Sequence, residues 1–157
     1  MKQLSLIPRQ KPIHGGNVNQ GKRKTLRPLA TDRPIHLVLK ATKAFHGCDG
    51  AFVLQESNRL AGKFQVKILD HAVADDHIHL VLKIPHRREY AGFIRSLTGL
   101  LARKYGKGYW SQLPFTRVAE WGKDYQNLGK YLEKNRLEAA GLLPYKDRFF
   151  REEDLFG

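Results

Sequence analysis

Two histidines one residue apart are the part of this sequence best suited to chemistry. His77 and His79 lie in the segment DHIHLVLK (76–83), whose alternation predicts a β-strand. Residues i and i+2 of a strand point the same way, so both imidazoles would project from one face. The opposite face is wholly apolar, which fixes the register: Ile78, Leu80, Leu82 and Ile84. Two imidazoles at this spacing could bind one divalent metal, and the alternative is that they are ordinary strand residues.

A tyrosine and an asparagine near the end of the chain add a second chemical element. Tyr131 and Asn135 are four residues apart in a segment that reads as a helix, so they share a helix face. A phenol can attack a phosphodiester to form a phosphotyrosine, which stores the bond energy for rejoining. A metal would assist by polarising the phosphate, and the Asn135 amide oxygen could complete a His-His-Asn site. The alternative is a core tyrosine and a surface asparagine.

The elements that would position these residues follow the order β-α-β-β-α-β, with one more helix at the end. This order predicts an α+β fold with a ferredoxin-like, split-βαβ antiparallel sheet, whose extra C-terminal helix carries Tyr131. The hexapeptide IHLVLK occurs at 35–40 and at 78–83, in the two strands expected to be central neighbours; no function is assigned to it. Strands are expected at 35–40, 64–69, 77–84 and 115–121, and helices at 49–61, 88–105 and from Asp124, as N-cap, to about Gly141.

Composition points to a polyanionic partner. The 157 residues suit one domain, and 28 Lys and Arg against 15 Asp and Glu give a net charge of +13. Nucleic acid is the commonest partner of so basic a domain, and an anionic membrane surface is the competing one. No stretch approaches the ~20 apolar residues of a membrane span, and the first residues lack a signal core, so we expect a cytoplasmic protein without a membrane partner. The single cysteine, Cys48, excludes an intramolecular disulfide and a cysteine-based zinc finger.

The charge is concentrated at the N-terminus, which predicts three parts of the chain. Residues 1–33 are rich in basic residues, proline and glycine, and we interpret them as a basic, largely irregular arm. The arm is either a terminus without a partner or a segment, including Lys22, Arg23 and Lys24, that follows a nucleic-acid backbone. Residues 34–144 form the predicted domain, and 145–157 form a C-terminal tail.

Taken together, DDHIHLVLK and YLEKNRLEAAGL resemble the HUH single-tyrosine transposases of bacterial insertion sequences, including the REP-associated tyrosine transposases. The resemblance covers residues 34–144 and implies that His77 and His79 bind the metal, that Tyr131 is the nucleophile and that Asn135 is the third ligand. Ala140-Gly141-Leu142 matches the end of the family's helix motif. Two positions depart from it: Arg136 replaces a frequent proline, which favours a longer helix, and Asp76 replaces a common asparagine. Tyr125 is the alternative nucleophile, but it is six residues earlier and faces away from Asn135.

The resemblance implies a transposase that cleaves and rejoins single-stranded DNA, with hairpins nearby, through a 5′-phosphotyrosine and with Mg²⁺ or Mn²⁺. A homodimer is expected on the same ground. Basic residues could hold phosphates and two aromatic rings could stack on unpaired bases, or these side chains are simply solvated or packed in the core. Two other classes stay open: a domesticated protein that binds DNA hairpins without cutting, and a small basic RNA-binding protein. The residues expected to contact nucleic acid are Arg87, Arg88, Arg95, Arg103, Lys104, Tyr109 and Trp110.

Overall fold

The computed structural model of the protein describes residues 12–42 and 49–144. Within them five strands form one antiparallel sheet in the order β1-β5-β2-β4-β3, accompanied by three helices. The predicted tail, 145–157, and the first eleven residues of the predicted arm lie outside the described residues. The elements are β1 (Ile13–His14), β2 (Ile35–Lys40), α1 (Asp49–Lys63), β3 (Lys67–Val73), β4 (His77–Lys83), α2 (Arg87–Tyr105), β5 (Phe115–Val118) and α3 (Lys123–Ala139).

The two copies of IHLVLK form the centre of the sheet, because β2 pairs with β4. The pairing is antiparallel and places Leu37 opposite Leu80 and Val38 opposite His79. Both strands are paired on their other edges, β2 with β5 and β4 with β3, and most of their residues are buried on both faces. The predicted ferredoxin-like arrangement is therefore confirmed.

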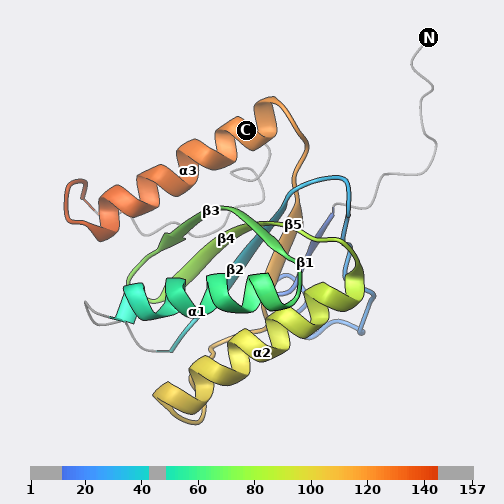
Figure 1. The fold of residues 1–157 in the computed structure, drawn as a ribbon, viewed down its shortest axis with the longest axis horizontal. Coiled ribbons are helices and arrows are strands. Elements are labelled where there is room, and N and C mark those ends of the chain that lie inside the picture. Colours follow the sequence, from blue (N-terminus) through green and yellow to red (C-terminus); the bar gives the residue numbers. More distant parts are fainter. Residues whose placement is uncertain (1–11, 43–48, 145–157) are drawn as a thin grey trace.

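The helices divide between the two faces of the sheet (Figure 1). α1 and α2 lie side by side on one face, and α3 crosses the other. The face under α1 and α2 carries Leu37 and Leu80, which belong to a core that also includes Phe93 and Leu97 of α2. This layering follows from the strand alternation, since the apolar side of β4 needs apolar helices to exclude water from it.

Strand β3 begins three residues later than the predicted strand at 64–69. The reason is that α1 continues to Lys63, and the next three residues form the turn that ends the helix. The Val66 amide donates to the Ala61 carbonyl (2.9 Å) and the Gln65 amide to the Gly62 carbonyl (3.3 Å). Gln65 adopts φ +56°, a left-handed conformation that ends helices by this bonding pattern. The chain becomes extended only after this turn.

The start of α3 also differs from the prediction. Gly122, at φ +92°, occupies the N-cap position, and Asp124 lies inside the first turn. The expected N-cap role of Asp124 is therefore wrong: its carboxylate accepts from the Glu120 amide at 2.8 Å, ahead of the helix. Because the chain turns here, β5 ends at Val118 and not near 121.

One strand was not predicted. Ile13 and His14 form β1, which pairs antiparallel with Arg117 and Thr116 of β5. Two residues are too few to show an alternating pattern in the sequence. They form a strand only because they pair with the edge of β5. No helix among the described residues has the length and hydropathy to cross a membrane.

The buried centre of the sheet yields a stability prediction. Leu80 of β4 is fully buried, so Leu80→Ala should lower the free energy of unfolding by about 2–5 kcal/mol, through lost apolar burial and a cavity. Leu113→Ala is the matched control, because Leu113 is 63% exposed and its truncation should cost less than about 0.5 kcal/mol. Urea unfolding followed by circular dichroism measures both. Equal losses in the two variants would contradict the described core.

Candidate active site

The two histidines of β4 project from one face of the sheet, as the alternation predicts. Their ring centroids are 4.8 Å apart, with the planes at 73°. His79 is fully buried, whereas the His77 side chain retains 16% of its exposure. The residues between and beside them, Ile78 and Leu80, are buried on the opposite face. The register of one strand therefore brings both imidazoles to the face that α3 covers.

His77 is oriented by the residue before it. Asp76 Oδ1 lies 2.5 Å from His77 Nδ1, so the carboxylate accepts the Nδ1 hydrogen of the ring. In a neutral imidazole the lone pair is then on Nε2. A carboxylate that fixes a histidine in this way is a common arrangement behind metal-binding histidines. Asp76 thus has a definite partner.

A third histidine, outside the His-x-His motif and not among the predicted site residues, completes the cluster. His36 of β2 is buried, and its Nε2 lies 3.1 Å from His79 Nδ1. The two rings stack at 5.3 Å between centroids and 16° between planes. Burial, and then the nearby Arg117 charge, lower the pKa of His36 to about 3. His36 is therefore neutral around pH 7.

The hexapeptide repeat could have been used to predict that His36 lies near His79. His36 and His79 are each the second residue of IHLVLK, and the two copies pair antiparallel. His36 is opposite Val81, and His79 is opposite Val38, so the two histidines are diagonal neighbours on the same face. Diagonal neighbours are within reach of long side chains.

Tyr131 of α3 lies against the histidines. Its ring centroid is 5.6 Å from that of His79 and 6.1 Å from that of His36, in both cases nearly edge-on. The tyrosine is half-buried and packs beside the apolar cluster that joins α3 to the sheet. Residues of β2, β4 and α3, far apart in the sequence, therefore meet at one place. The apolar cluster consists of Ala72, Val81, Ala119, Leu128 and Leu132.

Asn135 lies one turn after Tyr131 and is 6% exposed, so the alternative of a surface asparagine is wrong. Its Nδ2 donates to the Tyr131 carbonyl at 2.8 Å, which fixes the amide and leaves Oδ1 as its acceptor. Within residues 12–42 and 49–144, no three His, Cys, Asp or Glu side chains are grouped as a metal site.

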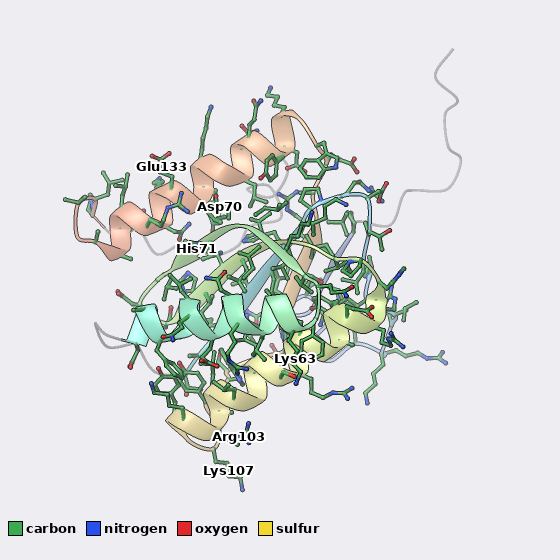
Figure 2. All side chains as sticks on the ribbon, viewed as in Figure 1. Lys63, Asp70, His71, Arg103, Lys107 and Glu133 are labelled. Atoms are coloured by element: carbon green, nitrogen blue, oxygen red, sulfur yellow. The ribbon has the colours of Figure 1, made fainter. Side chains whose placement is uncertain are left out.

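Arginines hold α3 over the sheet near both of its ends. At the start, Arg117 of β5 is buried and its Nη1 contacts both carboxylate oxygens of Asp124 at 3.0 and 2.9 Å. Near the end, Arg136 Nη1 donates to Asp70 Oδ1 at 2.8 Å and also to the His71 carbonyl. Figure 2 shows Asp70 and His71 on β3 beside α3. Arg136 thus attaches α3, which continues to Ala139, to β3.

The basic residues predicted to contact nucleic acid do not join this cluster. Those of α2 are exposed but lie across the sheet from Tyr131, and Figure 2 shows Arg103 and Lys107 at the end of α2 remote from α3. Lys22, Arg23 and Lys24 are exposed in a stretch without helix or strand. Their contacts with nucleic acid stay predictions. The α2 residues are Arg87, Arg88, Arg95, Arg103 and Lys104.

The two aromatic residues predicted to stack on bases are engaged within the protein. Tyr109 is 5% exposed and stacks on Tyr105 at 4.8 Å between centroids. The Trp110 indole donates to the Thr98 carbonyl at 3.0 Å and packs against the core of the α1 and α2 face. A base could stack on Tyr109 only if that ring left the core, so its stacking role stays a prediction.

The fold and the site together define a ferredoxin-like α+β domain whose central strand presents two histidines to a tyrosine on the C-terminal helix. The family model of the IS200-like transposases matches residues 34–129, more than half of the chain. The protein therefore belongs to the IS200-like transposase family, as the resemblance in the sequence predicted. The matched residues include His77 and His79 and end just before Tyr131. Among curated proteins, none matches the chain significantly.

One solved structure supports the same fold. A REP-associated tyrosine transposase bound to a REP hairpin has a TM-score of 0.58 to this chain at 10% identity, over 78% of this chain and 81% of its own. At this identity the likeness is one of fold alone. A candidate transposase from Deinococcus radiodurans R1 has a TM-score of 0.49 at 15% identity, over 73% of this chain and 98% of its own.

The ion pair at the start of α3 yields a prediction. Asp124→Asn leaves the buried Arg117 charge without its carboxylate, so the free energy of unfolding should fall by about 2–4 kcal/mol. Asp32→Asn is the matched control, since Asp32 is exposed and lies 3.5 Å from Arg33; its loss should be below about 1 kcal/mol. Urea unfolding measures both, and hydrogen exchange of α3 amides should accelerate in Asp124→Asn alone. An equal effect of the two substitutions would refute the anchoring of α3 by Arg117.

Proposed function

We propose that this transposase cleaves and rejoins single-stranded DNA through a 5′-phosphotyrosine on Tyr131, with Mg²⁺ or Mn²⁺ held by His77, His79 and Asn135. The observation that carries the proposal is the packing of Tyr131 against His79, 5.6 Å between ring centroids, on the face that His77 shares. Asn135 lies one helical turn further along the same face. Membership of the IS200-like family supports the same chemistry.

The donor set fits a divalent metal. Nδ1 of His77 contacts Asp76 and Nδ1 of His79 contacts His36, so Nε2 of each ring would be the coordinating atom. The Asn135 amide is fixed by its bond to the Tyr131 carbonyl and would offer Oδ1. Neutral nitrogen and oxygen donors suit Mn²⁺ at least as well as Mg²⁺. When bound, the metal would polarise the scissile phosphate and stabilise charge in the transition state.

The residues of the chain would carry the covalent steps. The Tyr131 oxygen attacks the phosphorus and forms a P–O bond, while the bond from phosphorus to the 3′ oxygen breaks. The phenol loses its proton and the departing 3′ oxygen gains one, which leaves a 5′-phosphotyrosine and a free 3′-OH. A 3′-OH then attacks the phosphotyrosine, re-forms the phosphodiester and releases Tyr131. Packing of α3 on the sheet would hold the phenol near the phosphate during both steps.

The DNA substrate would carry a hairpin near the cleaved strand. The net charge of +13 favours any nucleic-acid backbone, and the structural neighbour with a TM-score of 0.58 is bound to a REP hairpin. We propose that the basic residues of α2 and of 22–24 contact DNA outside the reaction centre, because the α2 residues lie on the other side of the sheet. The homodimer and the cytoplasmic location stay predictions.

Covalent adduct formation tests the nucleophile. Incubation with labelled single-stranded DNA carrying the hairpins that flank the gene, plus Mn²⁺, should give a protein–DNA adduct on a denaturing gel. Tyr131→Phe should reduce it at least about 100-fold, because no other group forms the phosphotyrosine. Tyr125→Phe is the matched control on the same helix: the Tyr125 ring contacts Trp121 instead, and its adduct yield should be unchanged. An adduct that survives Tyr131→Phe would overturn the assignment.

Removal of the metal or of its ligands is the second test. EDTA should abolish the adduct, and added Mn²⁺ should restore it. His77→Ala and His79→Ala should each lower the adduct yield about 10–100-fold at limiting Mn²⁺, because each removes one ligand. His86→Ala is the control, since His86 is exposed just before α2. Full activity of both variants in EDTA would exclude the metal site.

A domesticated hairpin binder is the competing interpretation. It predicts binding of the flanking hairpins, but no adduct with any genuine flanking sequence. The family match gives no support to the small RNA-binding alternative. Hairpin binding without an adduct in the wild type would therefore favour the domesticated protein.

A further inference from the structure

We infer that His36 is a positioning residue for His79: it binds Nδ1 of His79 and so presents Nε2 of that ring to the metal. The inference rests on the proposed function, because it takes His79 to be a ligand. It concerns a residue outside the His-x-His motif, on a different strand. His36 would contact neither the metal nor the DNA, and would act through His79 alone.

The geometry restricts what His36 can do. Its Nε2 lies 3.1 Å from His79 Nδ1. The two rings also stack with nearly parallel planes, which fixes each ring relative to the other. Both rings are buried in the centre of the sheet, where every residue of β2 is paired with a residue of β4. Neither ring can therefore turn without disturbing the other, and the orientation of His79 depends on His36.

The position of one hydrogen decides whether His79 can bind a metal. If His36 Nε2–H donates to His79 Nδ1, a neutral His79 carries its own hydrogen on Nε2 and has no lone pair there. If His79 Nδ1–H donates to His36 Nε2, the lone pair of His79 is on Nε2. Metal binding through Nε2 thus requires His36 to accept, and the hydrogen of His36 must then be on Nδ1.

The surroundings of His36 support a role toward His79. His36 Nε2 is within hydrogen-bond distance of His79 Nδ1, and the stacking of the two rings keeps these two atoms facing each other. Among the described residues, His36 Nδ1 has no hydrogen-bond partner. A buried polar atom left in this way is destabilising, and an apolar side chain of similar size would avoid the penalty. Packing alone therefore gives no reason for a histidine here, while a hydrogen bond to His79 does.

Mn²⁺ binding by the protein alone tests the inference without DNA. His36→Phe fills the space without an acceptor and should weaken Mn²⁺ affinity about 10–100-fold, as loss of a hydrogen-bonded partner behind a ligand does. His36→Gln offers an amide oxygen near the position of Nε2 and should recover affinity to within about threefold. Leu37→Ala is the matched control: Leu37 follows His36 on β2 and is fully buried in the core on the other face of the sheet, so truncation should reduce stability and leave affinity unchanged. Electron paramagnetic resonance of free Mn²⁺ gives the affinities.

Nitrogen-15 NMR of the imidazoles gives a second readout that needs no variant. In the wild type saturated with Mg²⁺, His79 and His36 should each carry their hydrogen on Nδ1. A hydrogen on Nε2 of His36 would overturn the inference even if His36→Phe fails to fold.

Equal Mn²⁺ affinity of His36→Phe and wild type would also overturn it, while leaving the proposed metal site intact. A weakened Mn²⁺ affinity in Leu37→Ala, or no recovery of affinity in His36→Gln, would reduce His36 to a packing role. Absence of Mn²⁺ binding in the wild type would instead refute the metal in the proposed function, and the inference with it.

Discussion

The alternation of β4 is the constraint on which the rest of the structure depends. Its apolar residues face α1 and α2, and pairing with β2 and β3 on both edges prevents the strand from sliding. Because side chains alternate with a period of two, a slip by one residue would bury His77 and His79 under α1 and α2 and expose Ile78 and Leu80 to α3. Burial of the apolar residues of β4 in the hydrophobic core therefore fixes the register of the strand, and the register fixes the face from which the two imidazoles project.

Docking of α3 is the second condition, and it uses the same helix face as the chemistry. Leu128 and Leu132 pack on small and branched residues of the sheet, and Tyr131 and Asn135 continue that stripe. Arginines hold the helix near both ends, one from β5 and one from α3 itself. The tyrosine therefore has little freedom to move relative to the histidines, which is what an attack on a positioned phosphate requires.

Most of the architecture could be predicted from the sequence, and the errors have local causes. The strands and helices that form the sheet and its two layers follow from apolar periodicity, which is a property of each segment alone. The N-cap assignment of Asp124 failed because its carboxylate reaches back to Arg117 and Glu120, a contact that exists only once β5 and α3 have met. His36 was overlooked because its partner is 43 residues away in the sequence.

The sequence by itself determined the transposase resemblance and which residues share a face: His77 with His79 on a strand, and Tyr131 with Asn135 on a helix. These are consequences of backbone periods of two and 3.6 residues. Only the tertiary structure decided that α3 crosses the histidine face, that His36 contacts His79, and that the basic residues of α2 lie on the other side of the sheet. The physical reason is that each of these depends on how whole elements pack, and packing is set by surfaces contributed from distant parts of the chain.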